Sequence, residues 1–347
     1  MNLQVFFEGQ PQVLEWGVVR LDKPLPNAGR LEAWVGQGMH AGLRYMEERL
    51  EERLSPPKLF PWAKSAVIFS IRQPVPFGAD TGAFRLASYA LGEDYHHIAR
   101  RILNAAEMHV RTVGATHGSP LPFVAPIQFA GFCDTWPVFE RDLAAEAGLG
   151  WRGKNATIIH RKHGSGFLLA GFFLDVDAND LESSAVPQED FCGGCTACLD
   201  ECPTDALVEP GRLDASKCLS YWTIEAKGEV PESISEKSGS WIFGCDICQE
   251  VCPWNHKHKK NTASVVSSSL PNTAMDWLQL LRKGGGFQSR FKNTPFLRAG
   301  RRALLRNTLI ALRHGNPEDV NNVLKEIQLE EDDPVVLGEL KKTLMIQ

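Results

Sequence analysis

"CGGCTACLDECP", residues 192 to 203, holds four cysteines spaced C-x2-C-x2-C-x3-C and closes with Pro203. This spacing is typical of bacterial chains that bind [4Fe–4S] clusters through cysteine thiolates. A second group of four cysteines lies downstream and also closes with a proline, Pro253. The two groups predict a small module whose fold is held together by metal ligands, as in a bacterial ferredoxin.

The order of the eight cysteines predicts which cluster each of them holds. In chains with two clusters, the fourth cysteine of each run ligates the other cluster. One predicted set is Cys192, Cys195, Cys198 and Cys252. The other set is Cys202, Cys218, Cys245 and Cys248. Two zinc sites would also use eight thiolates, but the Cys-Pro closures and the tight triple favour clusters. Haem attachment is excluded because histidine follows none of the C-x-x-C units.

The ninth cysteine, Cys133, lies far upstream in the stretch "GFCDTWPVFERD", residues 131 to 142. Because eight cysteines already complete two clusters, we expect Cys133 to be a small buried hydrophobe. Its neighbour Asp134 is most simply an N-cap or turn residue before a helix. A role in proton transfer requires burial beside Phe132 and Trp136, since the ordinary aspartate pKa of about 3.9 is too low for an acid at neutral pH.

Composition and charge limit the class of protein. The chain has 347 residues, 43% of them hydrophobic, and a net charge of −5. Its first residues, MNLQVFFEGQ, have neither a basic-plus-apolar leader nor a twin arginine, and the chain has no apolar run of about 18 residues, so a cytoplasmic protein without a membrane segment is expected. Residues 254 to 315 carry twelve Lys or Arg against one acid, Asp276. This asymmetry is typical of a site for a polyanion, although a solvated basic face would look the same.

Patterning predicts an α+β chain of three parts. In residues 1–184 we expect a buried strand at 66–71, a long amphipathic helix within 89–113, and a helix at 139–147 capped by Gly148. The apolar runs 156–160 and 167–174 predict a hairpin. Residues 185–260 form the cluster module, and residues 261–347 form a helical region that begins after a Ser-rich stretch and contains a basic helix at 297–312.

Two further motifs in the first part are weaker signals. Residues 148 to 153 match G-x-G-x-x-G, but a helix is expected before them and a strand after them, which is the reverse of a dinucleotide-binding loop. We therefore expect these glycines to cap a helix and to let the backbone approach another group closely. His96 and His97 begin the long helix, and adjacent helical positions point apart, so structural hydrogen bonds are expected of them.

Six stretches together carry a resemblance to epoxyqueuosine reductase. They are "GEDYHHIARRIL" (92–103), "CDTWPVFERDLAAEAGLGWRGKN" (133–155), "CGGCTACLDECPTDAL" (192–207), "LDASKCLSYWTIE" (213–225), "IFGCDICQEVCPWN" (242–255) and "LRAGRRALLRNTLIAL" (297–312). They occur in the family's order, from about residue 30 to 315. The tail after Gly315 is short and acidic compared with members that carry fuller helical repeats.

The resemblance implies a cobalamin-binding α/β sandwich-like catalytic domain (1–184), a ferredoxin-type 2×[4Fe–4S] domain (185–260) and a short HEAT-like helical region that contacts tRNA (261–347). It implies base-off cobalamin, because the family lacks the D-x-H-x-x-G corrinoid motif and so does this chain. By the same resemblance, Asp134 is the proton donor. The residues implied to line the corrin are Arg53, Asp94, Asp134, Ile158 and Leu169.

The implied reaction is the two-electron removal of the epoxide oxygen of epoxyqueuosine at the wobble position of a tRNA, through cob(I)/cob(II)alamin fed by two clusters. We expect an external electron donor, a monomer, and phosphate contacts from the basic segment, with Lys257, Lys259 and Lys260 as further candidates. The residues expected to bind the tRNA are Arg298, Arg301, Arg302 and Arg306. The alternatives are a reductive dehalogenase, which usually carries a twin-arginine signal, and a simple electron carrier, which would leave about 185 residues unexplained.

Overall fold

The computed structural model describes residues 2–116, 127–181, 188–256, 270–315 and 320–346. The chain divides into two compact units. The first comprises Met1–Gln73 and Tyr95–Cys195, and the second comprises Pro74–Asp94 and Thr196–Gln347. The sequence did not predict that Pro74–Asp94 belongs with the C-terminal half.

The first unit is built on a four-stranded sheet. Its strands, in spatial order, are β1 (Val13–Arg20), β2 (Ser65–Arg72), β7 (Phe167–Leu174) and β4 (Phe129–Phe132). All three neighbouring pairs are antiparallel, and β2 pairs with β7 along its whole length. The expected strand at 66–71 is confirmed as the core of β2.

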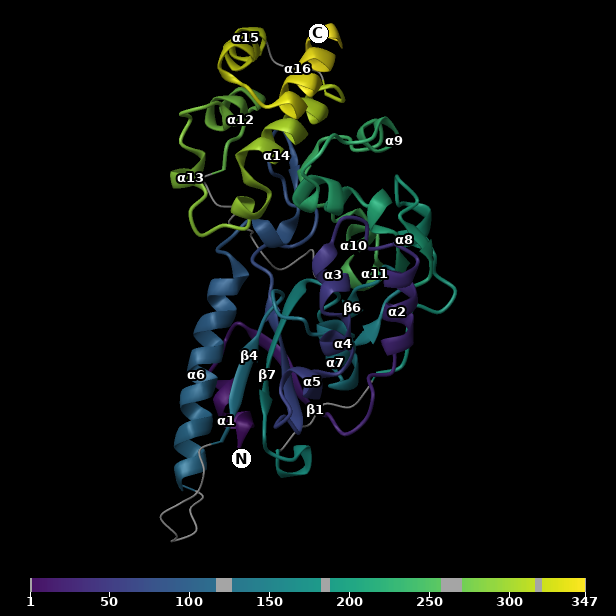
Figure 1. Cartoon of the computed structure of the whole chain (residues 1–347), viewed down its shortest axis with the longest axis vertical. Coiled ribbons are helices and arrows are strands. Elements are labelled where there is room, and N and C mark those ends of the chain that lie inside the picture. Colours follow the sequence, from purple (N-terminus) through teal and green to yellow (C-terminus); the bar gives the residue numbers. More distant parts are fainter. Residues whose placement is uncertain (1, 117–126, 182–187, 257–269, 316–319, 347) are drawn as a thin grey trace. The chain divides into compact units, whose positions relative to one another are not determined.

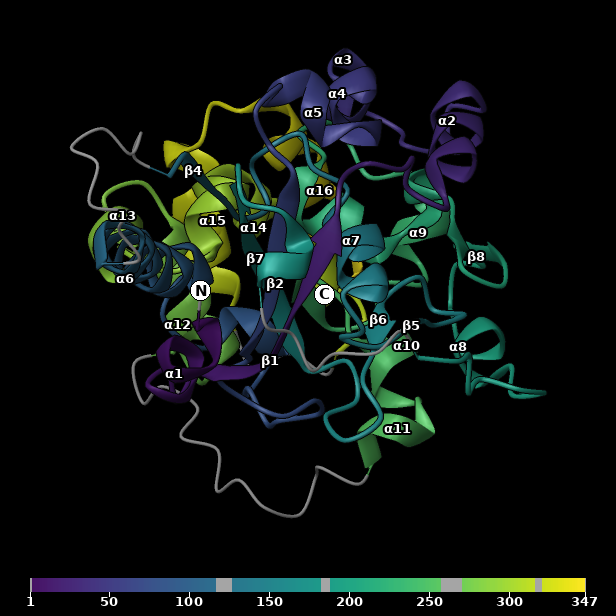
Figure 2. The same ribbon diagram turned by 90° about the horizontal axis from the view of Figure 1, so that it is seen from below.

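Helices cover both faces of this sheet. Successive side chains of β2 point to opposite faces, and because most of them are apolar, both faces have to be covered. Ala66 and Ile68 pack with residues of α7 (Glu140–Glu146) on one face. Val67 and Phe69 pack with α6 (Tyr95–Thr116) on the other. Figures 1 and 2 show α6 and α7 on opposite sides of the sheet. The first unit is therefore a layered α/β sandwich, and the predicted long helix is confirmed as α6.

Shorter elements complete the first unit. The face with α7 also carries residues from α2 and α4, and the face with α6 carries α1. These elements are α1 (Leu3–Glu8), α2 (Ala28–Gly36), α3 (Arg44–Glu48), α4 (Leu50–Leu54), α5 (Pro56–Leu59) and the 3-10 turn η2 (Ala178–Asp180).

The predicted hairpin between residues 156–160 and 167–174 is wrong. Strand β6 (Ile158–Ile159) pairs with β5 (Trp151–Arg152), whereas β7 lies inside the four-stranded sheet. The reason is that β7 is apolar along nearly its whole length and is paired on both sides, so its place is between two strands rather than at the edge of a ribbon.

The second unit contains the part of the predicted cluster module that follows Cys195, and a helical region. The module elements are α8 (Ala197–Asp200), β8 (Leu207–Glu209), β9 (Arg212–Leu213), η3 (Ala215–Lys217), the π-helix η4 (Tyr221–Glu225), α9 (Glu232–Ser235), β10 (Trp241–Phe243), α10 (Ile247–Glu250) and α11 (Pro253–His256). Strand β10 pairs in parallel with β3 (Arg85–Leu86), which explains why the segment Pro74–Asp94, with its turn η1 (Ser88–Ala90), belongs to this unit.

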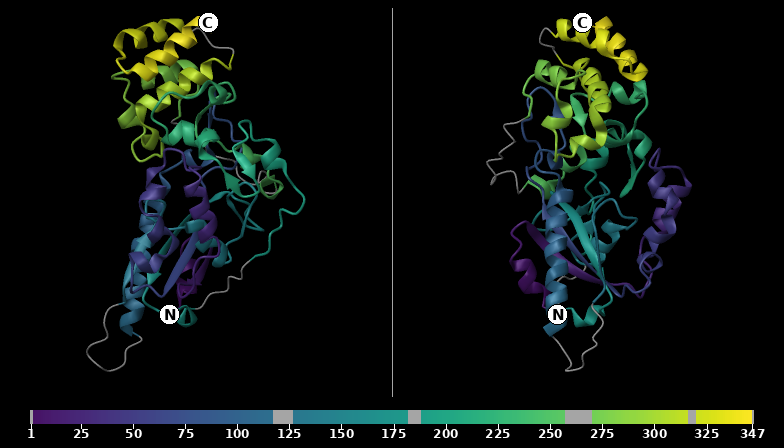
Figure 3. Two further views of the ribbon diagram at one scale, coloured as in Figure 1. Left: turned by 45° about the vertical axis from the view of Figure 1, so that its right-hand side comes forward. Right: turned by 60° about the vertical axis from the view of Figure 1, so that its left-hand side comes forward.

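The helical region packs around a fully buried Trp277 and the rings of Phe291 and Phe296. Its helices are α12 (Ala274–Leu281), α13 (Phe287–Arg290), α14 (Phe296–Leu312), α15 (Asn321–Glu330) and α16 (Pro334–Ile346), drawn in yellow-green and yellow in Figure 3. The predicted basic helix is confirmed as α14, with a break at Gly300, where φ is +79°. Among the described helices, none is long and apolar enough to cross a membrane.

Candidate active site

Asp134 lies in a turn just beyond β4. Its φ is +53°, in the left-handed region that aspartate tolerates better than most residues. Its backbone N–H donates to Glu140 Oε1 at 2.6 Å. Because α7 begins at Glu140 and its N-cap position is Phe139, the interpretation of Asp134 as an N-cap is wrong. The turn instead presents the Asp134 carboxyl independently of the helix.

The Asp134 carboxyl faces a histidine. His96 Nε2 lies 3.5 Å from Asp134 Oδ2, and the Asp134 side chain is 38% exposed. The predicted burial of Asp134 beside Phe132 and Trp136 is wrong, since Phe132 is buried in the core and Trp136 is itself exposed. An imidazole at this distance can exchange a proton with the carboxyl.

Glu140 is the second acid of the site. Burial of its carboxyl and, to a smaller extent, the negative charge of Asp134 raise the pKa of Glu140, and the net pKa is about 8. The Asp134 N–H, Arg53 and His96 act in the opposite direction. At neutral pH the Glu140 carboxyl therefore holds its proton while its Oε1 fixes the Asp134 turn. Glu140 was not among the predicted site residues, although it stands in the stretch 131–142 at the first position of the helix.

Arg53 brings a buried positive charge to the same site. Its guanidinium donates to the carbonyls of Val138 (3.3 Å) and Tyr45 (3.1 Å), and the residue as a whole is only 7% exposed. Its Nε has no hydrogen-bond partner among the described residues. Burial lowers the pKa of Arg53, whereas Glu140 and Asp134 raise it. A buried donor without a partner is costly, so this Nε is suited to an acceptor from a bound molecule.

The other residues expected to line a corrin have different surroundings. Ile158 is almost fully buried in the core that contains α7, and Leu169 packs against the same core. Asp94 belongs to the second unit, where its N–H donates to the Asn293 carbonyl. All three stay predictions. Cys133 is confirmed as a buried residue of the hydrophobic core.

None of the eight remaining cysteines, all of which the structure describes, forms a disulfide, and they are distributed over both units. Burial raises the pKa of Cys218, Cys245 and Cys248, and Cys202 contributes to the rise at each of them. These four thiols therefore lie close enough to influence one another, and a positive metal centre would offset the cost of ionising them. Among the described residues, no three His, Cys, Asp or Glu side chains are arranged to hold a single metal ion.

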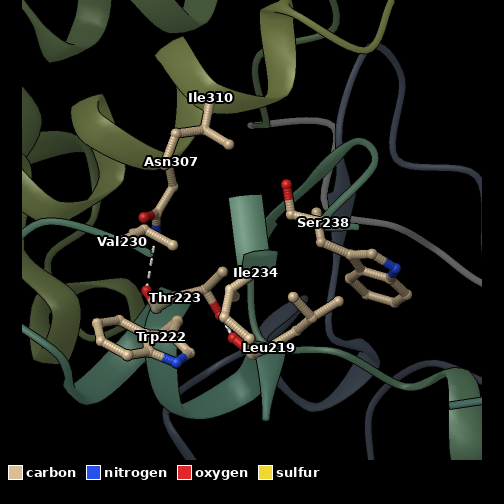
Figure 4. Close-up of a pocket in the computed structure, with 9 residues that line it drawn as sticks. Leu219, Trp222, Thr223, Val230, Ile234, Ser238, Asn307 and Ile310 are labelled. Atoms are coloured by element: carbon tan, nitrogen blue, oxygen red, sulfur yellow. Dashed lines mark hydrogen bonds between the residues drawn. The ribbon is translucent and has the colours of Figure 1, made fainter. Parts of the chain in front are cut away.

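Arg306 corrects one of the tRNA contacts expected from the sequence. Its side chain is 1% exposed and donates to the carbonyls of Trp222, Ala226 and Gly228. The adjacent Asn307 donates to the Thr223 carbonyl at 2.9 Å, beside a small apolar pocket (Figure 4). Arg306 is therefore a core residue that holds η4 and the segment after it, and its guanidinium is not available to a phosphate.

The other three arginines of α14 pair with acids. Arg298 pairs with Glu225 at 2.7 Å, Arg301 with Glu331 at 2.9 Å, and Arg302 with Asp333 at 2.6 Å. Arg298 and Arg302 keep 38% and 46% of their side chains exposed, whereas Arg301 keeps 26%. The acidic tail thus neutralises part of the predicted basic surface. Lys257, Lys259 and Lys260 lie outside the described residues.

Comparisons with known proteins identify the family. A family model described as "4Fe-4S double cluster binding domain" matches residues 191–255, and one described as "Epoxyqueuosine reductase QueG, DUF1730" matches residues 53–135. The epoxyqueuosine reductase of Cyclobacterium marinum is 35% identical over 285 residues, covering 81% of this chain and 86% of the relative. The chain belongs to the epoxyqueuosine reductase family.

Other members of the family agree with this. The epoxyqueuosine reductase of Pseudomonas aeruginosa is 35% identical, covering 86% of this chain and 80% of the relative. A crystal structure of epoxyqueuosine reductase with an epoxyqueuosine-modified tRNA-Tyr stem loop matches with a TM-score of 0.78 and 25% identity, covering 99% of this chain and 98% of that one. The predicted membership is confirmed, and the chain is an oxidoreductase with a [4Fe–4S]-binding domain.

Proposed function

We propose that this chain reduces epoxyqueuosine to queuosine at the wobble position of a tRNA, using base-off cobalamin and two [4Fe–4S] clusters, with Asp134 as proton donor. The observation that carries the proposal is the Asp134 turn. Its carboxyl is accessible and lies beside His96, and a protonated Glu140 fixes its backbone. Membership of the family supplies the substrate class.

The residues around Asp134 fit a bound corrin. The Arg53 Nε is buried without a partner among the described residues, and amide or phosphate oxygens of the cofactor could accept from it. We propose Arg53, Asp94, Ile158 and Leu169 as further residues of this site. Cobalamin bound here would supply low-valent cobalt for reduction of the strained ring.

The side chains handle the protons. Loss of the epoxide oxygen as water consumes two electrons and two protons, and the carbon–oxygen bond breaks more readily when the oxygen is protonated. Asp134 donates to that oxygen, and His96 at 3.5 Å can return a proton to the Asp134 carboxylate. Glu140 keeps the turn in its left-handed conformation through the 2.6 Å bond to the Asp134 N–H.

The cysteines would supply the electrons through two clusters. The first set is Cys192, Cys195, Cys198 and Cys252, and the second is Cys202, Cys218, Cys245 and Cys248. The mutual influence of Cys202, Cys218, Cys245 and Cys248 on their pKa values supports the second set. Such clusters pass electrons singly from an external donor, which is unidentified.

The tRNA would meet the exposed part of α14. A relative has been crystallised with a modified tRNA stem loop, and we propose that Arg298 and Arg302 contact phosphates after exchanging their acidic partners. We propose Arg301 as a weaker contact, because its partner Glu331 is almost fully buried. A cytoplasmic location and a monomeric state stay predictions.

The test is reconstitution followed by turnover. The loaded chain should contain about eight irons and one cobalamin and should convert epoxyqueuosine in an anticodon stem-loop under reducing conditions. A loaded chain that leaves this substrate unchanged but dehalogenates an organohalide would contradict the proposal and favour the dehalogenase alternative.

A further inference from the structure

The glycine loop, residues 148–155, has no part in the proposed chemistry, yet its backbone is tightly specified. Gly148 follows the C-terminus of α7 with φ +79°, and Gly150 has φ +150°. A Cβ on Gly150 would lie 2.3 Å from the Ile159 carbonyl oxygen, so only glycine fits against the neighbouring strand. This close pairing of β5 with β6 fixes the position of the Trp151 side chain, which is 3% exposed.

Trp151 reaches the first cysteine of the ferredoxin-type run. Its indole Nε1–H donates to Cys192 Sγ at 3.4 Å. Its ring also packs edge-on against Phe191, the residue before Cys192, with ring centroids 5.2 Å apart. Trp151 is almost fully buried and Cys192 is partly buried, so the indole side of this N–H···S bond is shielded from water.

Lys154 contacts the same cysteine run from the other end of the loop. Its Nζ donates to the Gly193 carbonyl at 2.6 Å and to the Cys195 carbonyl at 2.9 Å. A third attachment runs in the opposite direction, since Gln188 Nε2 donates to the Gly148 carbonyl at 3.0 Å. The glycine loop therefore holds the segment 188–195 at several points and places one donor and one positive charge beside it.

These contacts matter for a cluster because reduction adds negative charge to its sulfurs. An N–H donor to a ligand sulfur stabilises the reduced form and makes the reduction potential more positive, and a nearby cation acts in the same direction. The ammonium of Lys154 acts on carbonyls rather than on sulfur and is partly exposed, so its effect is screened more than that of Trp151.

We propose that the glycine loop raises the reduction potential of the cluster that Cys192 holds, through Trp151 and, to a smaller extent, Lys154. This inference rests on the proposed assignment of Cys192 as a cluster ligand. It gives the inverted G-x-G-x-x-G motif a function, since the glycines position a donor against a thiolate instead of binding a nucleotide. Trp151 and Lys154 are positioning residues that act through the cluster.

The test is a redox titration of the reconstituted full-length chain followed by electron paramagnetic resonance, without turnover. Trp151→Phe keeps the ring against Phe191 and removes only the N–H, so the potential of one cluster should become more negative while the iron content is unchanged. Lys154→Met should shift the same potential in the same direction by less.

Two matched variants serve as controls. Trp222→Phe removes an indole N–H that donates to the Ser216 carbonyl rather than to sulfur, and Lys162→Met removes an exposed positive charge that follows the glycine loop in the sequence. Neither should move the potential that Trp151→Phe moves. Equal shifts in Trp151→Phe and Trp222→Phe would overturn the inference.

Cys192→Ser separates this inference from the ligand assignment. It should lower the iron content and remove or perturb the cluster whose potential Trp151→Phe shifts. An unchanged iron content in Cys192→Ser would refute the assignment of Cys192 as a cluster ligand. If Cys192→Ser loses iron but Trp151→Phe leaves the reduction potential unchanged, only the tuning role is refuted. Loss of iron in Trp151→Phe, with no shift in the potential of the remaining cluster signals, would also refute only the tuning role.

Discussion

The turn that contains Asp134 and the helix α14, which contains Arg306, place their charged side chains in opposite environments, one accessible to solvent and the other buried. Asp134 is 38% exposed, in a left-handed turn fixed by one backbone hydrogen bond to Glu140. Arg306 is 1% exposed, and its guanidinium is satisfied by three backbone carbonyls and the Asn307 amide oxygen. The side chain proposed to meet a substrate stays accessible to solvent, whereas the one that maintains the fold is buried with its hydrogen-bonding groups satisfied.

Asp134→Asn is the strongest test of the first half of this comparison. The amide keeps the size and the turn preference but cannot donate a proton as an acid, so turnover should fall by about 10² to 10⁴. Cobalamin binding, stem-loop binding and the melting temperature should stay close to those of the wild type. Undiminished turnover would show that the proton comes from another group.

Arg306→Met tests the second half. It leaves the carbonyls of Trp222, Ala226 and Gly228 without their donor, and should lower the free energy of unfolding by about 3 kcal/mol or more. Arg302→Met, on the same helix, removes a partly exposed pair and should cost about 1 kcal/mol or less. Denaturant titration of both variants measures the difference. Equal losses of unfolding free energy in the two variants would contradict the assignment of Arg306 to the core and of Arg302 to the surface.

Glu140→Gln tests how the Asp134 turn is held. The amide oxygen can still accept the Asp134 N–H, but the group can no longer ionise. The folded pKa of Glu140, about 8, lies above the ordinary 4.5, so the folded state favours the protonated form. The stability that this preference contributes is fully present below about pH 4.5 and is lost as the pH rises through about 8.

Wild-type stability and turnover should therefore fall toward pH 8 and above, as a second negative charge forms beside Asp134, with Arg53 and His96 opposing it. In Glu140→Gln this fall should be absent. Glu107→Gln, which removes an exposed carboxyl paired with Arg111 on α6, should leave the wild-type profile intact. A profile that is identical in Glu140→Gln and the wild type would refute the role of Glu140. Thermal melts and turnover from pH 5 to about 9 measure both effects.

The smallest expected effects concern the exposed arginines of α14. Arg298→Gln and Arg302→Gln should each weaken stem-loop binding and lower the slope of log affinity against log salt by about 1. Arg100→Gln, an exposed change on α6, is the control and should leave the slope unchanged. If neither α14 variant alters the slope, the tRNA docks elsewhere.

Local patterns predicted much of the fold. The apolar run of β2 and the four-residue periodicity of α6 identified a buried strand and an amphipathic helix, because side-chain burial follows the period of the backbone. The predicted hairpin was wrong because the short strand β6 and the long strand β7 both appear in the sequence only as apolar runs, which do not show the pairing partner of either strand. Which strand pairs with which is decided by contacts far apart in the sequence.

The sequence by itself indicated the family and predicted the cluster cysteines, because ligand spacing is a local property that the chain carries even when unfolded. Only the tertiary structure decided the roles of individual charges. It buried Arg306, brought Glu140 and His96 to Asp134, and placed Trp151 on Cys192, which lies 41 residues away. Burial and the partners across the fold set the charge state and availability of a side chain, and neither is written in its immediate neighbours.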